Sequence, residues 1–250
     1  MDNLFKKNGY LIFKNLIPKK KIKNIFYTLD NLLKKSKYKS NYSKFKNRQL
    51  EEKISQLMIF IKNKDKKYAS EIYEFLKKTY AVNNLIDEKI FNTLSKKISF
   101  KTKNVILQQN ILRIDIPKDE KNFLNYHQDY MNDYNAKLNK FLGFTIWCPI
   151  YKKTNTYYGG LELLSGSHKF GWKTTRKKKD KKKIKSQKFQ INRKLINSNK
   201  LKSIIPELAA GDLLLFDTRL IHKSVKNQSE LARFTAQYRY GFIDKAKILN

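Results

Sequence analysis

The spacing of apolar residues changes near residue 100, and this change limits the possible folds more than any other feature of the chain. Before it, apolar residues recur at helical spacing, so helices are expected after Pro18 and at 51–62, 66–80 and 83–97. The first helix has the apolar face Ile22, Ile25, Phe26, Leu29, Leu32 and Leu33. The polar segment 34–48 between them is expected to be a loop.

After residue 100 the apolar residues alternate, as they do in strands with one buried face. Leu112 and Ile114 take one face there, and Arg113 and Asp115 take the other. Strands are expected there at 104–116, 141–150, 160–164, 213–222 and 232–240, and one short strand is expected at 8–13, before the helices. No helix-length pattern separates the later strands, which favours an antiparallel sandwich or barrel. The fold class expected is therefore mainly β with a helical buttress.

The chain is long and apolar enough to form one domain with its own core. It has 250 residues, of which 40% are hydrophobic. We expect a single domain over 1–250, with a mostly helical N-terminal part over 1–100 and a β core over 101–245. A basic loop insertion is expected at 173–202.

The formal charge of +34, from 55 basic and 21 acidic residues, could indicate a nucleic acid or another anionic partner. However, Lys, Asn and Ile are abundant throughout, as an A/T-rich genome would produce, and no basic helix or aromatic platform stands out. Nucleic acid is therefore not the favoured partner. The single Cys148, the absence of a membrane-length apolar run and the polar N-terminus lead us to expect a soluble cytoplasmic protein of open oligomeric state.

Three histidines are present, and two of them suggest a metal site. His127 and Asp129 are one residue apart, so on an extended segment both side chains emerge on one face. This pair alone is weak evidence, but His222 follows a turn and a buried strand far downstream. Two histidines and one carboxylate leave three open positions on an octahedral ion, an arrangement typical of non-haem Fe(II) oxygenases. His127, Asp129 and His222 are therefore the candidate metal ligands and catalytic residues.

A polar strand face follows His222. Arg233, Thr235, Gln237 and Arg239 alternate with apolar residues, so this face is either solvated or holds an anion. Iron chelated by 2-oxoglutarate needs a cation for the distal carboxylate, and Arg233 can supply a bidentate fork with the Thr235 hydroxyl beside it. Arg239 is interpreted as structural.

The order of several motifs resembles that of the phytanoyl-CoA dioxygenase family of Fe(II)/2-oxoglutarate oxygenases. The resemblance covers nearly the whole chain, and the motifs that carry it are the strand at 8–13, Tyr126-His127-Gln128-Asp129, 143–150, 159–169, 211–216, His222 and Arg233-x-Thr235. Their order and spacing together are specific, although no single motif is.

The resemblance implies a double-stranded β-helix, which is a jelly roll of the cupin-like kind. It implies that His127, Asp129 and His222 bind Fe(II) and that Arg233 binds 2-oxoglutarate, with Thr235 beside it. Gln128 and Trp147 match positions that line the cosubstrate or substrate pocket. Leu112, Arg113 and His168 are candidates for the substrate pocket.

Two segments depart from the family pattern. Ser165 stands where a Pro-Gly-Ser-His turn usually has its proline. The segment Lys173–Lys188 holds ten basic residues and one acid, Asp180. It could be a solvated flexible loop, or a basic lid that attracts an anionic substrate.

The expected function is therefore hydroxylation of a small or medium-sized metabolite, with Fe(II) as the metal, 2-oxoglutarate as cosubstrate and dioxygen as oxidant. Related halogenases lack the carboxylate ligand, so Asp129 favours hydroxylation over halogenation. A desaturase or ring-forming enzyme would look the same in sequence. The alternative outside this class is an inactive jelly roll that binds anionic ligands or nucleic acid through its basic surface, and a cupin-like isomerase is a further possibility.

Overall fold

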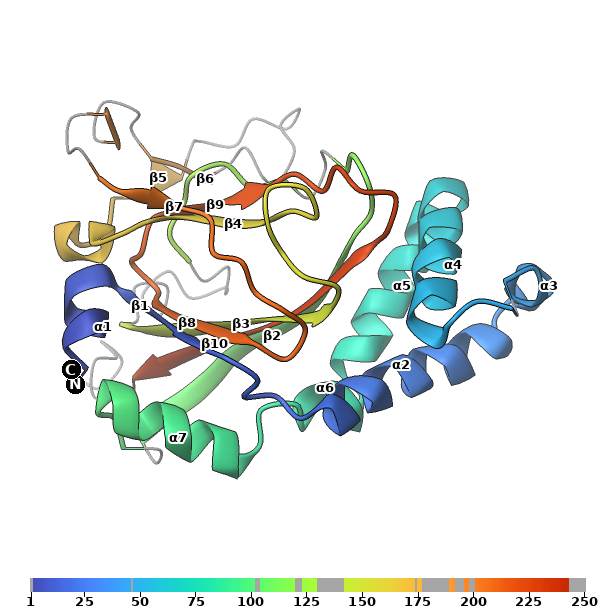
Figure 1. Cartoon of the computed structure of the whole chain (residues 1–250), viewed down its shortest axis with the longest axis horizontal. Coiled ribbons are helices and arrows are strands. Elements are labelled where there is room, and N and C mark those ends of the chain that lie inside the picture. The colour runs from blue at the N-terminus through green and yellow to red at the C-terminus, as the bar shows by residue number, and fades with distance from the viewer. Residues whose placement is uncertain are drawn as a thin grey trace.

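The computed structural model describes residues 2–45, 47–101, 104–119, 123–129, 142–173, 175–176, 189–191, 196–197 and 201–242. The N-terminal part holds one strand and seven helices within these ranges. They are α1 (Asn3–Asn8), β1 (Tyr10–Phe13), α2 (Lys19–Lys34), α3 (Lys39–Ser43), α4 (Leu50–Lys64), α5 (Lys66–Lys77), α6 (Tyr80–Asn83) and α7 (Glu88–Ile98). Figure 1 shows α2, α4 and α5 gathered at one end of the molecule and α7 below the larger sheet.

The helix boundaries differ from the predicted ones where polar side chains cap the backbone. The helix predicted at 83–97 begins instead at Glu88, because the Asp87 side chain accepts a hydrogen bond from the amide of Ile90. Asp65 caps α5 in the same way through the amide of Tyr68. The short helix α3 lies inside the segment predicted to be a loop.

The C-terminal part is built from antiparallel sheets. Its strands are β2 (Val105–Asp115), β3 (Gly143–Tyr151), β4 (Gly160–Leu164), β5 (Thr175–Arg176), β6 (Phe189–Gln190), β7 (Ser203–Ile204), β8 (Leu213–Asp217), β9 (His222–Val225) and β10 (Arg233–Phe242). The larger sheet has the order β1-β8-β3-β10-β2, the smaller one β7-β4-β9, and β5 pairs with β6. A short 3-10 helix, η3 (Ser167–Phe170), follows β4. Figure 1 shows the smaller sheet lying across from the larger one.

The single strand predicted at 213–222 is wrong, because the chain turns inside it. The Asp217 side chain accepts hydrogen bonds from the backbone and side chain of Arg219, and the Leu220 amide donates to the Asp217 carbonyl. β8 therefore ends in the larger sheet, and β9 begins with His222 in the smaller one. This change of sheet carries His222 to the opposite wall of the core.

Two apolar clusters lie on the two faces of the larger sheet. The outer cluster joins the helices to the outward side chains of its strands, including Ile146 of β3 and Phe234 of β10. The inner cluster lies between the two sheets and contains Trp147, Leu161, Leu163, Leu208, Leu214, Phe216 and Leu220. The helices therefore cover the outside of the larger sheet, and its inner face is left to the site.

Within the described ranges, no helix has both the length and the apolar character needed to span a membrane.

Candidate metal centre and cosubstrate pocket

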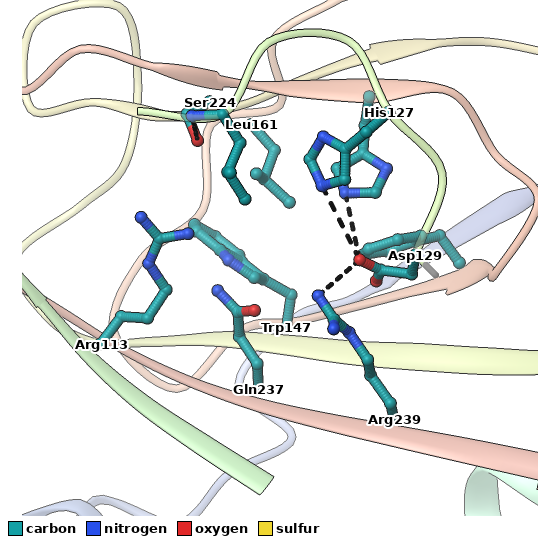
Figure 2. A pocket seen from close by; sticks show the side chains of 11 residues that line it. Arg113, His127, Asp129, Trp147, Leu161, Ser224, Gln237 and Arg239 are labelled. Atoms are coloured by element: carbon teal, nitrogen blue, oxygen red, sulfur yellow. Dashed lines mark hydrogen bonds and ion pairs between the residues drawn. The ribbon is translucent and has the colours of Figure 1, made fainter. Parts of the chain in front are cut away.

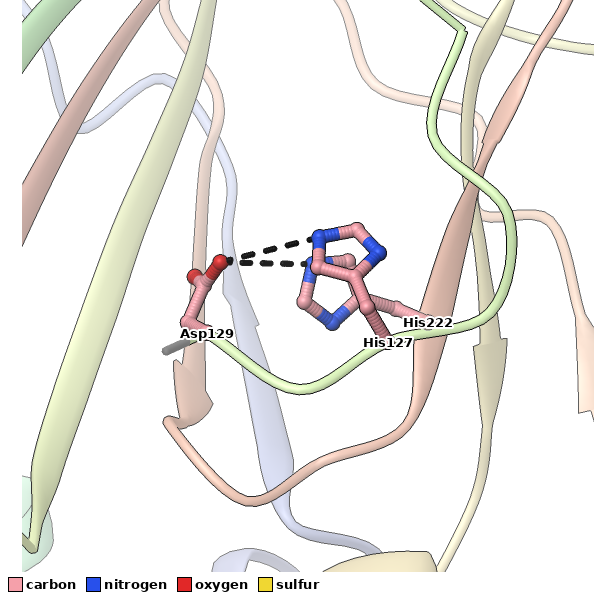
Figure 3. Close-up of side chains that lie close together, drawn as sticks. All are labelled: His127, Asp129 and His222. Atoms are coloured by element: carbon pink, nitrogen blue, oxygen red, sulfur yellow. Dashed lines mark ion pairs between the residues drawn. The ribbon is translucent and has the colours of Figure 1, made fainter. Parts of the chain in front are cut away.

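His127 and His222 are brought together by backbone pairing. The amide of His127 donates to the carbonyl of His222 at 2.9 Å, and the amide of His222 donates back at 3.0 Å. Asp129 is fixed two residues further on, where its amide donates to the Thr218 carbonyl at 2.9 Å. The three side chains point toward one another between the sheets, as Figure 3 shows. The predicted convergence of these residues in space is therefore present in the structure.

Backbone carbonyls set the orientation of both imidazole rings. Nδ1 of His127 lies 2.7 Å from the Asn125 carbonyl, and Nδ1 of His222 lies 2.9 Å from the Leu220 carbonyl. A carbonyl can only accept, so each Nδ1 carries the proton and each Nε2 presents a lone pair. Burial lowers the pKa of His127 to about 3 and also lowers that of His222. Both rings are therefore neutral at pH 7, which is the form that binds metals.

Asp129 is a buried carboxylate that stays ionised. Burial alone would raise its pKa, but Arg239 and the two histidines hold it at about 2. The Nη2 of Arg239 donates to Asp129 Oδ1 at 2.6 Å, and the Thr145 hydroxyl donates to Oδ2 at 2.6 Å. Oδ1 is also the oxygen nearest the rings, at 3.8 Å from Nε2 of His127 and 3.7 Å from Nε2 of His222.

This donor set suits a divalent cation. One ligand atom from each of the three residues lies within 4.8 Å of the others, and all three residues are buried. Two neutral imidazoles and one carboxylate match the ligand preferences of iron and leave further coordination positions open.

A second buried charge cluster lies at the start of β10. The Nη2 of Arg233 donates to Asp115 Oδ2 at 2.6 Å, and the Nη2 of Arg113 donates to Oδ1 at 2.9 Å. Only 6% of Arg233 is exposed, yet its Nε and Nη1 have no hydrogen-bond partner among the described residues. The hydroxyl of Thr235 is also buried without a partner there. Buried donors of this kind normally have hydrogen-bond partners, so these groups are candidates for binding a ligand with acceptor oxygens.

The face that carries these donors is not solvated. Arg233 and Gln237 are 6% exposed and Thr235 is 0% exposed, which excludes solvation as the reason for the polar residues on this part of the strand face. Thr235 pairs with Arg113 of β2 on one side and with Pro149 of β3 on the other. The face therefore lies in the middle of the larger sheet and looks into the space between the sheets.

A cavity with about 250 Å³ of empty space connects the histidines to this polar face. Its lining residues are Arg113, Leu124, His127, Asp129, Trp147, Leu161, Phe216, His222, Ser224, Gln237 and Arg239. In Figure 2 Arg113 lies on one side of Trp147, and Asp129 and Arg239 lie on the other. The guanidinium carbon of Arg233 lies 5.9 Å from the centre of the Trp147 ring. Trp147 therefore separates the two charged ends of the site.

The other residues predicted for the pockets lie elsewhere. Gln128 is fully buried, and its amide donates to the carbonyls of Gly171 and Arg219 and accepts from the Lys173 amide. Leu112 packs in the outer cluster with the helices. His168 lies in η3 with Nε2 3.2 Å from the Lys6 carbonyl. None of these three lines the cavity, and neither do Arg233 and Thr235, so the predicted pocket roles of all five stay predictions.

Two polar side chains of the site are not among the binding residues that the sequence predicts. Arg239 was interpreted as structural, but it lines the cavity and contacts Asp129. Asp115 holds Arg233 in place. The available signal was the alternation itself, since it placed Arg239 on the same strand face as Arg233 and Asp115 beside Arg113.

The predicted basic insertion at 173–202 is described only in part. Of the segment Lys173–Lys188, the structure describes residues 173 and 175–176, and the remainder lies outside the described residues. The choice between a solvated loop and a basic lid is therefore not tested.

Comparison with solved structures identifies the fold. The chain superposes on EctD from S. alaskensis with 2-oxoglutarate and 5-hydroxyectoine with a TM-score of 0.62 at 12% identity, covering 97% of this chain and 75% of that chain. The epimerase SnoN, in complex with Fe3+, alpha ketoglutarate and nogalamycin RO, gives 0.59 at 11% identity, covering 96% and 81%. The carbocyclase SnoK gives 0.57 at 13% identity, covering 96% and 82%. These likenesses confirm the predicted cupin-like fold class.

Among curated proteins, no sequence match was found. The sequence model of the phytanoyl-CoA dioxygenase family, in contrast, matches residues 5–235 and so spans both the helical part and the site. The chain therefore belongs to the phytanoyl-CoA dioxygenase family, and this membership confirms the predicted enzyme class, a 2-oxoglutarate-dependent non-haem iron dioxygenase.

Proposed function

We propose that this protein is a hydroxylase of a small metabolite in which His127, Asp129 and His222 bind Fe(II). The observation that carries the proposal is the convergence of two imidazole lone pairs and one ionised carboxylate in a buried space. The family supplies the cofactor chemistry, and the structural neighbours solved with iron and 2-oxoglutarate share the fold.

We assign the distal carboxylate of 2-oxoglutarate to Arg233 and Thr235. The Nε and Nη1 of Arg233 and the hydroxyl of Thr235 are three of the buried polar atoms that lack partners in the described structure. Guanidinium N–H groups and a hydroxyl are donors of the kind that bind a carboxylate. Asp115 accepts from the remaining Nη2 and so holds the fork toward the interior.

When bound, Fe(II) and 2-oxoglutarate would supply the activation of dioxygen and the oxidation of a substrate C–H bond, and His127, Asp129, His222 and Arg233 would hold them. The chain positions the reactants and excludes water. Both imidazoles are oriented by backbone carbonyls, and the Thr145 hydroxyl fixes the plane of the Asp129 carboxylate. Trp147, Leu161 and Phe216 form apolar walls that keep bulk water from the reacting centre.

One feature favours hydroxylation over halogenation. Asp129 occupies the coordination position that a halide needs in the related halogenases. An inactive anion-binding module is not favoured, because such a module does not need two oriented imidazoles facing a buried carboxylate.

The test is an anaerobic titration of the metal-free protein with Fe(II) and then 2-oxoglutarate, followed through the weak visible charge-transfer band of the chelate. We expect the band to appear with one equivalent of each, and to be absent in Asp129→Ala and His222→Ala. Aerobic succinate release across acyl-CoA, amino-acid and sugar-nucleotide candidates then identifies the substrate. Failure of the intact protein to form the band would contradict the proposed function.

A further inference from the structure

Arg239 is a partly buried cation beside the metal ligands, and the assignments above leave it without a role. It extends from the inner face of β10 into the cavity, where its Nη2 contacts Asp129 Oδ1 at 2.6 Å. Its Nη1 donates to the Gln109 side chain at 2.9 Å, and its Nε has no partner among the described residues. Figure 2 shows its head group between Gln237 and Asp129.

The contact between Arg239 and Asp129 uses the oxygen that a metal needs. Oδ1 faces both imidazole Nε2 atoms, whereas Oδ2 is engaged by the Thr145 hydroxyl. A dication held by the imidazoles would take charge from Oδ1 and repel the guanidinium. Arg239 therefore serves as the counter-ion of Asp129 only while no metal is bound, and metal binding leaves it in need of another anion.

The charge of Arg239 leads to the same conclusion. Its described ion pair is with Asp129, and 12% of the Arg239 side chain is exposed. A metal on Asp129 Oδ1 would weaken that ion pair. Breaking the ion pair of a largely buried charge is costly, so a monoanionic group would complete the site.

Arg239 and Arg233 serve different ends of the site. They lie six positions apart on β10, and at about 3.3 Å per residue their backbones are roughly 20 Å apart. Arg239 is therefore too far along the strand to share the distal carboxylate assigned to Arg233. Its free Nε–H and its Nη2 form a fork of the kind that binds carboxylate or phosphate, and the Gln237 amide lies beside it.

We propose that Arg239 binds an anionic group of the substrate, a carboxylate or a phosphate, and becomes available for it when Asp129 takes the metal. This inference rests on the proposed function of the site. It identifies the substrate as a small molecule with a compact anionic group close to the carbon that is oxidised.

The first measurement is binding to the protein saturated with Mn(II) and 2-oxoglutarate, in which no turnover occurs. Propionate and glycerol phosphate are titrated against their uncharged counterparts propionamide and glycerol by calorimetry. We expect one or both anions to bind and the uncharged compounds not to bind. The stronger of the two anions distinguishes a carboxylate from a phosphate. Equal binding of charged and uncharged probes, or no binding of either anion, overturns the proposal.

Variants then assign the anion site. We expect Arg239→Gln to weaken anion binding at least tenfold and Arg239→Lys to weaken it less. Arg48→Gln is the matched control, because Arg48 pairs with Glu52 on the surface and does not line the cavity. Loss of anion binding in Arg113→Gln with retention in Arg239→Gln would move the site to Arg113 and overturn the proposal.

Metal affinity provides a readout that is independent of activity. Because Arg239 occupies Asp129 Oδ1, Arg239→Gln should bind Mn(II) several-fold more tightly than the unaltered protein. A tenfold loss of Mn(II) affinity in Arg239→Gln would instead make Arg239 a positioning residue for Asp129 and overturn the proposal. If the unaltered protein binds neither Mn(II) nor 2-oxoglutarate, the proposed function fails. If the unaltered protein binds both, but Arg239→Gln leaves its affinity for the anions unchanged, only the present inference fails.

Discussion

His127 and His222, which are 95 positions apart in the chain, exchange two backbone hydrogen bonds of 2.9 and 3.0 Å. Their ring centres are 4.2 Å apart as a result. The spacing of these two imidazoles is therefore set by main-chain pairing between the segment 123–129 and β9. A substitution at either histidine should remove a ligand without disturbing the position of the other.

Replacing Asp129 should abolish metal binding and also destabilise the metal-free protein. Asp129→Ala leaves the partly buried Arg239 without its counter-ion, and breaking such a pair costs up to about 3–5 kcal/mol. The double variant Asp129→Asn/Arg239→Gln removes both charges and should recover most of that stability without recovering metal affinity. Urea denaturation and metal titration of the three proteins check this. Equal stability of the single and double variants would show that the ion pair does not matter.

Replacing Arg233 should weaken 2-oxoglutarate binding selectively. Charge-assisted hydrogen bonds contribute about 1.5–3 kcal/mol, so Arg233→Gln should raise the dissociation constant roughly 10- to 100-fold. Metal affinity should be unchanged, because Arg233 contacts Asp115 and not the metal cluster. Thr235→Val keeps the shape of the side chain and should raise the dissociation constant for 2-oxoglutarate less than tenfold. Calorimetric titration of the Mn(II)-loaded protein measures both constants, and a matching loss of metal affinity would contradict the assignment.

Replacing Gln128 separates a structural role from the cosubstrate role that the family resemblance implies. Its amide satisfies the carbonyls of Gly171 and Arg219 and the amide of Lys173. Gln128→Leu leaves these groups unsatisfied and should cost about 2–4 kcal/mol of unfolding free energy. The affinity for 2-oxoglutarate should stay within twofold in the folded variant. A normal stability combined with weakened cosubstrate binding would support the pocket role instead.

The metal-free protein should lose stability as the pH falls from 6.5 toward 3. Burial lowers the pKa of His127 from 6.5 to about 3, so in this range the unfolded chain takes up a proton that the folded chain does not. Stability is then full above pH 6.5 and falls by up to about 1.4 kcal/mol per pH unit for each such histidine. His222 contributes with the same sign. Denaturation at several pH values should give a shallower slope in His127→Gln, and an unchanged slope would contradict the assignment.

Much of the site could be predicted because it depends on side-chain alternation along single strands. The alternation along β10 follows from the sequence, and so do the two faces of the strand that carry Arg233 and Phe234. The spacing of His127 and Asp129 likewise predicted one shared face. These are local properties of an extended backbone.

The features that could not be predicted depend on contacts between distant segments. The turn at Asp217 interrupts an apolar run whose periodicity suggested a single strand, because capping by Arg219 outweighs the strand tendency. The role of Gln128 depends on the carbonyls of Gly171 and Arg219, which no spacing rule connects to it. The pairing of Arg239 with Asp129 similarly requires β10 to lie opposite the segment that carries the ligands.

The position of β10 also has a consequence for the order in which the chain can fold. β10 is the last strand of the sequence within the described ranges, yet it lies between β3 and β2 in the larger sheet. Until residues 233–242 have left the ribosome, β2 has no neighbouring strand in that sheet, and the outer cluster lacks the side chains that β10 contributes. During synthesis, β2 and the facing edge of β3 therefore stay unpaired in this sheet until β10 has been made, which favours assistance from a chaperone at that stage.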